Sequence, residues 1–226
     1  MDRLVLRTAP FALRRPFVAT AVVSAFLLLG AGTAYAGFGE GYFYKKHTTP
    51  IPDGHGKAQV KLPATLPNDV DPIVQYVSIS VRIDHPQTHD LVLRLKRPDF
   101  QYMGAPQSGI PRVLTVDDQE THGKNLGKGP CPSGTPTSVP GRFTTLNDAG
   151  GPPYPMTPMA TPPLSSGSPP YKGVFAPTEA LSGFNGYHAP GSGEPDQEEN
   201  WTLSVKDKKN GHAGKIRCAI LYLYRV

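Results

Sequence analysis

Serine, histidine and aspartate side chains are the first candidates for chemistry in this chain, because together they form the catalytic triad of serine hydrolases. Asp53 lies two residues before His55, and serines occur at positions 165, 166 and 168 and at Ser192. None of these serines lies in a G-x-S-x-G motif, which presents the nucleophile of many hydrolases on a sharp turn. The sequence therefore predicts no enzymatic activity.

Two of the seven histidines, His85 and His89, are four residues apart. On a helix this spacing places two zinc ligands on one face. Here Pro86 separates them, and the segment 85–88 (His-Pro-Gln-Thr) is typical of a turn between strands. We interpret both histidines as solvated turn residues.

The first 36 residues resemble an export signal. Four arginines, including the pair Arg14 and Arg15, precede an apolar stretch over 17–29, and residues 34–36 (Ala-Tyr-Ala) form a typical cleavage site. The apolar stretch is short for a membrane span, so membrane contact is expected only through an uncleaved signal. We expect a secreted protein, and the general secretory and twin-arginine routes both fit.

Removal of the signal leaves roughly 190 residues, enough for one domain with a single core. The formal net charge falls from +5 to +2, because the signal contains four arginines and one aspartate. This near balance argues against a nucleic-acid partner.

The two cysteines, Cys131 and Cys218, are predicted to form one disulfide, because an exported chain folds in an oxidising compartment. Cys218 belongs to the predicted last strand and Cys131 to a loop rich in proline and glycine. The bond would tie that loop to the sheet and contribute about 2–4 kcal/mol.

The elements that must position these residues are predicted to be β-strands. Apolar residues recur with the period of a half-buried strand over 58–62, 77–83, 91–95 and 201–205, and 113–116 is a further short strand. In the last strand, Ile216, Cys218, Ile220, Tyr222 and Tyr224 are predicted to share one face. We interpret the strands at 77–83 and 91–95 as a hairpin-like pair. No helical period persists, so the chain is predicted to be all-β and to form a sandwich.

Two segments lack this alternation. Residues 37–50 are expected to be a lead-in to a domain that spans 51–226. Twelve of the 26 prolines lie within 130–171, which predicts a long loop insertion. Within it, 152–158 has polyproline II character and could dock a partner, although we interpret the insertion as stiff and solvated.

Several motifs follow one another in an order that resembles the P domain (P/Homo B domain) of kexin-like proprotein convertases and bacterial subtilisin-type serine proteases. They are Ile51-Pro52-Asp53, His89-Asp90-Leu91, the segment 143–149 with Asn147 and Asp148, Phe184-Asn185-Gly186, and the strand from Trp201 to Asp207 followed by Gly214. The chain departs from the family pattern where His89 and Asn200 replace glycine and where Asn147 replaces an acid.

The resemblance implies a jelly-roll β-sandwich, similar to galactose-binding domains, without the catalytic domain that usually precedes it. It also implies a non-catalytic accessory or stabilising role beside a separately encoded, exported subtilisin-type protease. No cofactor is required. Some P-domain-like modules carry calcium, and Asp90 and Asp148 are the carboxylates we nominate as ligands, with turn capping as the alternative for both.

The matched residues also have structural interpretations. Trp201 is expected to fill the core between the sheets, and Asn185-Gly186 to form a tight turn. Two other functions remain open. One is an extracellular glycan- or peptide-binding module that uses the aromatic residues Tyr42 to Tyr44, and the other is a degenerate serine protease fragment.

Overall fold

The structure is a computed structural model that describes residues 39–64, 73–119, 121–134, 141–148, 161–189 and 200–225. The predicted export signal, the proline-rich stretch 152–158 and Ser192 lie outside these residues. Residues 38–226 form a compact unit by themselves. Among the described residues, no helix is long and apolar enough to cross a membrane.

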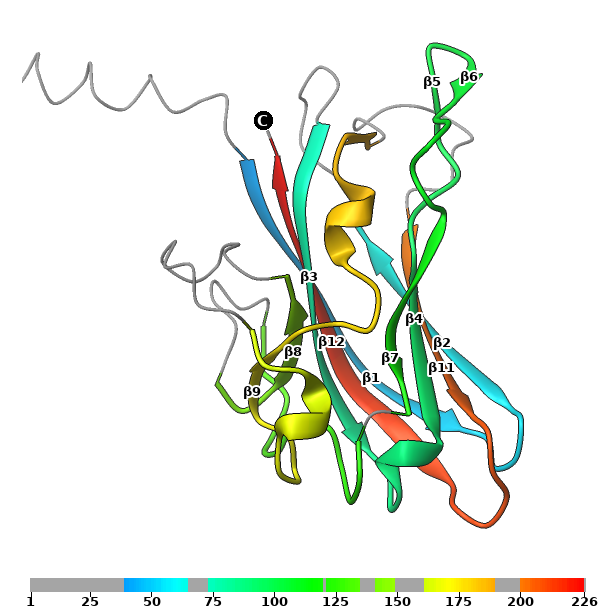
Figure 1. The fold of residues 1–226 in the computed structure, drawn as a ribbon, viewed down its shortest axis with the longest axis vertical. Helices are drawn as coiled ribbons and strands as arrows, with labels where there is room; N and C mark the ends of the chain where they lie inside the picture. Colours follow the sequence, from blue (N-terminus) through cyan, green and yellow to red (C-terminus); the bar gives the residue numbers. More distant parts are fainter. Residues whose placement is uncertain are drawn as a thin grey trace, which may run out of the picture. The chain divides into compact units, whose positions relative to one another are not determined.

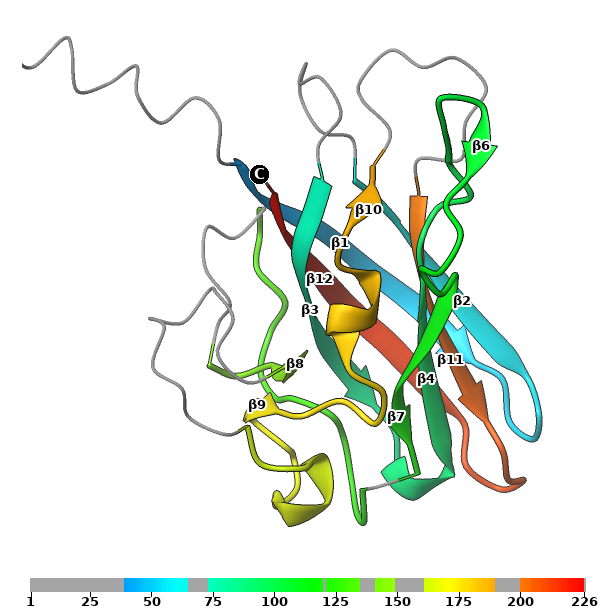
Figure 2. The same cartoon turned by 45° about the horizontal axis from the view of Figure 1, so that its top comes forward.

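The described residues form two sheets and one small ribbon (Figures 1 and 2). The six-stranded sheet contains, in spatial order, β1 (Gly39–Ile51), β12 (Gly214–Arg225), β3 (Ile73–Asp84), β8 (Thr144–Asn147) and β9 (Gly173–Phe175), with β10 (Tyr187–His188) also paired to β3. The four-stranded sheet has the order β2 (Lys57–Pro63), β11 (Asn200–Asp207), β4 (Leu91–Lys96) and β7 (Val113–Asp118). The ribbon joins β5 (Gln101–Tyr102) to β6 (Ala105–Pro106), and three short 3-10 helices complete the described elements: η1 (Thr88–Asp90), η2 (Leu164–Ser166) and η3 (Leu181–Phe184).

The core lies between the two sheets, because alternate side chains of each sheet point toward the other. The strand at 57–63 shows this alternation fully, with Ala58, Val60 and Leu62 buried and their neighbours exposed. The remaining strands contribute buried apolar residues to the same cluster: Ile79 and Val81 from β3, Leu93 and Leu95 from β4, Leu203 and Val205 from β11, and Leu221 and Leu223 from β12. The predicted all-β fold is confirmed, and the jelly-roll assignment stays a prediction.

The strand β1 corrects the expectation for residues 37–50. Instead of an irregular lead-in, residues 39–51 form a long strand that pairs with β12 in antiparallel register. Its aromatic residues pack on both faces: Phe43 contacts the main core, whereas Tyr42 and Tyr44 contact a second cluster on the outer face of the sheet. A strand that is apolar on both faces has no alternation to detect.

The predicted hairpin of 77–83 with 91–95 is also wrong. Both strands exist, but β3 belongs to the six-stranded sheet and β4 to the four-stranded sheet. Each pairs with a strand from the C-terminal part of the chain, β3 with β12 and β4 with β11. The link at 85–90 therefore crosses from one sheet to the other.

Two further differences concern the insertion and the last strand. Residues 144–147, inside the predicted loop insertion, form β8 between β3 and β9. In β12 the register with β3 shifts between Ile216 and Cys218, so Ile216 joins the main core and Cys218 the outer cluster with Ile220. Ile216 therefore does not share a face with Cys218 and Ile220 as predicted, because a bulge lies between them.

Candidate functional site

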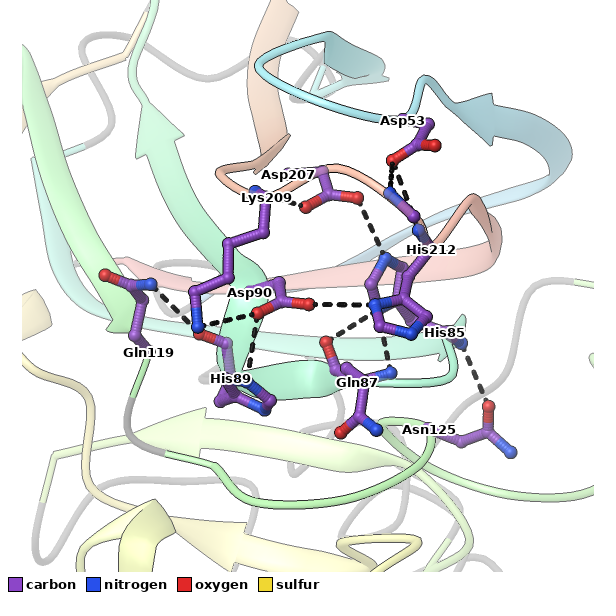
Figure 3. Close-up of polar contacts among 11 residues, drawn as sticks. Asp53, His85, Gln87, His89, Asp90, Gln119, Asn125, Asp207, Lys209 and His212 are labelled. Atoms are coloured by element: carbon purple, nitrogen blue, oxygen red, sulfur yellow. Dashed lines mark hydrogen bonds and ion pairs between the residues drawn. The ribbon is translucent and has the colours of Figure 1, made fainter.

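Four segments meet at one end of the sandwich and bring a set of polar side chains together (Figure 3). These segments are the β1–β2 turn at 52–56, the link at 85–90, residues 119 and 121–125, and the β11–β12 turn at 208–213, and we call this region the polar end. Backbone hydrogen bonds join them, including His55 N to Asp207 O at 2.9 Å and Lys208 N to Asp90 O at 2.8 Å. These main-chain hydrogen bonds fix the positions of the segments that carry the polar side chains.

A buried histidine–aspartate pair lies at the centre of the polar end. His85 Nε2 is 3.2 Å from Asp207 Oδ2, and both side chains are fully buried. His85 Nδ1 lies 2.7 Å from the carbonyl oxygen of Gln87, and Asp207 Oδ1 accepts the backbone N–H of Lys209 at 3.0 Å. Both imidazole nitrogens are therefore occupied within the fold, so the interpretation of His85 as a solvated turn residue is wrong.

Gly214, one of the motif residues, has a steric role beside this pair. A Cβ at position 214 would lie 2.4 Å from His85 Cδ2 and 2.8 Å from the carbonyl oxygen of Asp84. Both distances are below the closest approach of real side-chain carbons. Only glycine allows β12 to pass so close to the buried imidazole.

A histidine–aspartate pair is the base and the orienting acid of a hydrolase triad, so its environment matters. A general base must reach a nucleophile or a water molecule. Among the described residues, no hydroxyl or thiol is hydrogen-bonded to His85, and the His85 ring is closed off from solvent. The contacts of His85 and Asp207 are therefore those of a structural ion pair or hydrogen bond, not those of a catalytic pair.

Asp90 forms a second buried centre beside the pair. Its side chain is 1% exposed and is surrounded by three basic groups: His89 Nε2 at 3.0 Å, Lys209 Nζ at 3.4 Å and His212 Nδ1 at 3.4 Å. A buried carboxylate needs such partners, because burial without them is costly. These three basic groups lie around the Asp90 carboxylate, where a metal cation would have to bind.

Asp148, the second nominated calcium ligand, lies elsewhere. Its carboxylate accepts the backbone N–H groups of Leu181 at 2.9 Å and Ser182 at 2.6 Å, at the start of η3. This is the capping alternative, since backbone donors at the first turn of a helix need an acceptor. The structure does not bring Asp90 and Asp148 into one site. Among the described residues, no group of three or more histidine, cysteine or acidic side chains is placed to hold a metal ion.

The other motif residues occupy core and turn positions. Trp201 is 1% exposed, and its ring meets Phe184 edge-on at 5.1 Å and Tyr187 at 5.9 Å between ring centroids. Leu91 opens β4 and is fully buried. Gly186 has a positive φ of 84° and donates its N–H to Val74 O, whereas Asn185 has a φ of −63°, so only the glycine uses the left-handed region.

The predicted disulfide is confirmed. Cys131 and Cys218 are bonded, with their Cα atoms 6.2 Å apart. The bond ties the segment after β7 to the outer face of β12, beside Phe143 and Ile220. Tyr44 Oη donates to Pro132 O at 2.8 Å and strengthens the same attachment. Tyr42 and Tyr44, nominated as ligand-binding aromatics, are thus partly covered by this packing.

Comparisons with known proteins give little. No family model matches the chain, and no curated protein matches it. Among solved structures, it is similar to a chain in the crystal structure of the Aeromonas sobria serine protease in complex with its chaperone, with 14% identity and a TM-score of 0.38. The similarity covers 90% of this chain but only 30% of that chain, and it is too weak to support an argument about function.

Proposed function

We propose that this chain is an exported, non-catalytic module that assists or stabilises a separately encoded subtilisin-type serine protease. The observation that supports a non-catalytic role is the closed His85–Asp207 pair. Catalysis by such a pair requires an imidazole nitrogen that can take a proton from a nucleophile. Here one nitrogen contacts Asp207 and the other contacts the Gln87 carbonyl.

The protease partner is suggested by the order of motifs that resembles a P domain. Three residues of the last of these motifs hold key positions in the sandwich: Trp201 in the core, Asp207 at the crossing between the sheets and Gly214 beside the buried imidazole. The Cys131–Cys218 disulfide agrees with folding outside the reducing cytoplasm. A rigid, disulfide-bonded sandwich is suited to a supporting role, because it offers a stable surface to a partner.

The experiment that tests this proposal is affinity capture from the culture supernatant of the source organism, using the purified protein as bait. We expect the captured fraction to contain a protein that a fluorophosphonate probe labels, because that probe reacts with activated serines. The captured protease should also lose activity more slowly at raised temperature when the bait is present.

The control bait is the same protein after reduction and alkylation, which breaks the Cys131–Cys218 bond. Capture of no labelled protease by the native bait, or equal capture by both baits, would contradict the proposed partner. Labelling of a single serine in the bait itself, with peptidase activity that is lost on substitution of that serine, would contradict the non-catalytic role.

A further inference from the structure

A shallow pocket of ≈ 510 Å³ opens beside the polar end, next to the buried His85. Its walls come from the end of β3, from the segment around Asn125 and from the start of β12 at Gly214 and Lys215. These walls are held in place by hydrogen bonds between the backbone of Asn125 and that of His85 and between the backbones of Leu126 and Ile83. The pocket thus belongs to the rigid part of the domain.

Three side chains that line the pocket, those of Lys124, Lys215 and Asn125, offer hydrogen-bond donors. Lys124 and Lys215 line it, and neither ammonium forms an ion pair with a described acidic side chain. The Asn125 side chain uses its oxygen to accept the backbone N–H of His85 at 2.9 Å. Its amide nitrogen therefore faces away from that contact and has no partner among the described residues.

The acidic residue of the pocket, Asp84, is already neutralised. Arg82 contacts one carboxylate oxygen at 3.0 Å, and Arg217 contacts the other at 2.6 Å. Among the described residues, the two lysines that line the pocket and the two arginines that contact Asp84 carry four positive charges, against the one negative charge of Asp84.

The other acidic groups that the structure describes at the polar end do not compensate this excess. Asp207 is buried beneath the His85 ring and is bonded to it, and Asp90 is surrounded by its own basic partners. Asp53 accepts the backbone N–H groups of Gly211 and His212. A pocket that offers donors and positive charge selects a ligand group that is both an acceptor and an anion, and a carboxylate fits this description.

We propose that this pocket binds carboxylate side chains of an acidic peptide segment on a protein partner. The volume is that of a site for one or two side chains, within the common range of roughly 300–1,000 Å³. Lys124 and Lys215 line the same pocket, which favours a few carboxylates over an extended sulfated chain. The identity of the partner rests on the proposed function, but the preference for carboxylates can be tested without the protease.

The test measures the fluorescence anisotropy of a labelled peptide in which glutamate alternates with alanine, with purified protein added. The same peptide with glutamine replacing glutamate is the neutral counterpart. We expect the glutamate peptide to bind more tightly, and its binding to weaken as salt is added, because added ions screen exposed charges. Lys124→Ala with Lys215→Ala should weaken binding about tenfold, since both direct charge contacts are lost.

The matched control is Lys57→Ala with Lys61→Ala, which removes the same charge from exposed positions on β2. We expect its binding to stay within about twofold of the native value, because neither lysine lines the pocket and both charges are exposed and screened. Melting temperatures of both double variants should match that of the native protein, since all four side chains lie at the surface or its margin.

Three results would overturn the proposal. They are unchanged binding in the Lys124 and Lys215 variant, an equal loss in the control variant, and binding of a heparin fragment by the native protein when the glutamate peptide does not bind. The proposed function fails separately: if the native bait captures no protease but the glutamate peptide still depends on Lys124 and Lys215, the pocket stands and the protease partner falls.

Discussion

His85 and Asp207 contact each other across the two sheets, with Nε2 and Oδ2 3.2 Å apart although 122 residues separate them in sequence. His85 follows the last residue of β3 in one sheet, and Asp207 is the last residue of β11 in the other. The contact therefore holds the sheets together at the end where the chain crosses between them.

Replacement of Asp207 by alanine should destabilise the domain strongly, because it leaves the buried His85 without its partner. Loss of one member of a buried pair costs about 3–5 kcal/mol. Urea denaturation followed by tryptophan fluorescence measures the free energy of unfolding. The control is Asp118→Ala, which removes an exposed pair with Lys208 and should cost about 0–1 kcal/mol. Similar values for both variants would refute a stabilising role for the buried pair.

Gly214→Ala should destabilise the domain by about 1–3 kcal/mol, the usual range for an atom added to a packed interior. The reason is the 2.4 Å approach of the added Cβ to His85 Cδ2. Gly134→Ala is the control, because a Cβ there would meet no atom within 4 Å and the backbone has no positive φ. If both variants melt at the native temperature, the close approach of β12 to His85 is not as the structure describes it.

Trp201→Ala should cost about 3–5 kcal/mol, because it removes a buried indole and leaves a cavity between the sheets. Phe184 and Tyr187 would each lose an edge-on aromatic contact. Since the variant lacks tryptophan, far-UV circular dichroism measures its melting. Met103→Ala is the control at a side chain that is 84% exposed. A shift of only a degree or two for Trp201→Ala would refute its place in the core.

Removal of the disulfide should lower the free energy of unfolding by about 2–4 kcal/mol, because the bond closes a long loop in the unfolded chain. The bond joins residues separated by 87 positions. Replacement of both Cys131 and Cys218 by serine, compared with the oxidised native protein, measures this contribution. Intact-mass analysis of the native protein after alkylation without reductant should show no added groups. Two alkylated thiols would contradict the bond.

Alkaline pH should destabilise the domain partly through Tyr76. Burial raises the pKa of this phenol above its usual value of 10.0, and the nearby Asp148 carboxylate raises it further. A raised pKa in the folded state means that the unfolded chain ionises first. The contribution of Tyr76 is therefore fully present below about pH 10 and is lost as the pH rises above it.

The variant Tyr76→Phe isolates this effect, because phenylalanine keeps the ring and cannot ionise. We expect its free energy of unfolding to fall less between neutral and alkaline pH than that of the native protein, measured by denaturation at matched ionic strength. An identical fall in both proteins would show that Tyr76 ionises equally in the folded and unfolded states.

The sequence predicts the strands whose two faces differ in polarity. It does not predict which strands pair, because those contacts join residues far apart in the chain. Alternation identifies β2 and β11 because one face of each meets the core. Alternation does not identify β1, because Tyr42, Phe43 and Tyr44 all pack against apolar residues, on one face of the sheet or the other. The disulfide is predictable because two cysteines allow only one pairing.

The polar end is less accessible to sequence analysis. Nothing near Asp207 indicates that it meets His85, since the contact forms only when β11 and β3 take their places in different sheets. The same is true of Lys124 and Lys215, which line one pocket but lie on separate segments. Asp90 and Asp148 show the converse, because two carboxylates within recognisable motifs belong to different local structures.

The position of β12 has a consequence for biosynthesis. This strand is the last described in the chain, yet it lies between β1 and β3 and supplies Cys218 to the disulfide. During synthesis, β1 and β3 therefore lack the strand that pairs with both of them until residues 214–225 have left the ribosome or the translocation pore. A nascent chain that stops before this point exposes two unpaired strand edges and an unpaired thiol, which makes it a substrate for chaperones and prone to aggregation. The six-stranded sheet is thus expected to form only after residues 214–225 have been synthesised, with β12 completing it between β1 and β3.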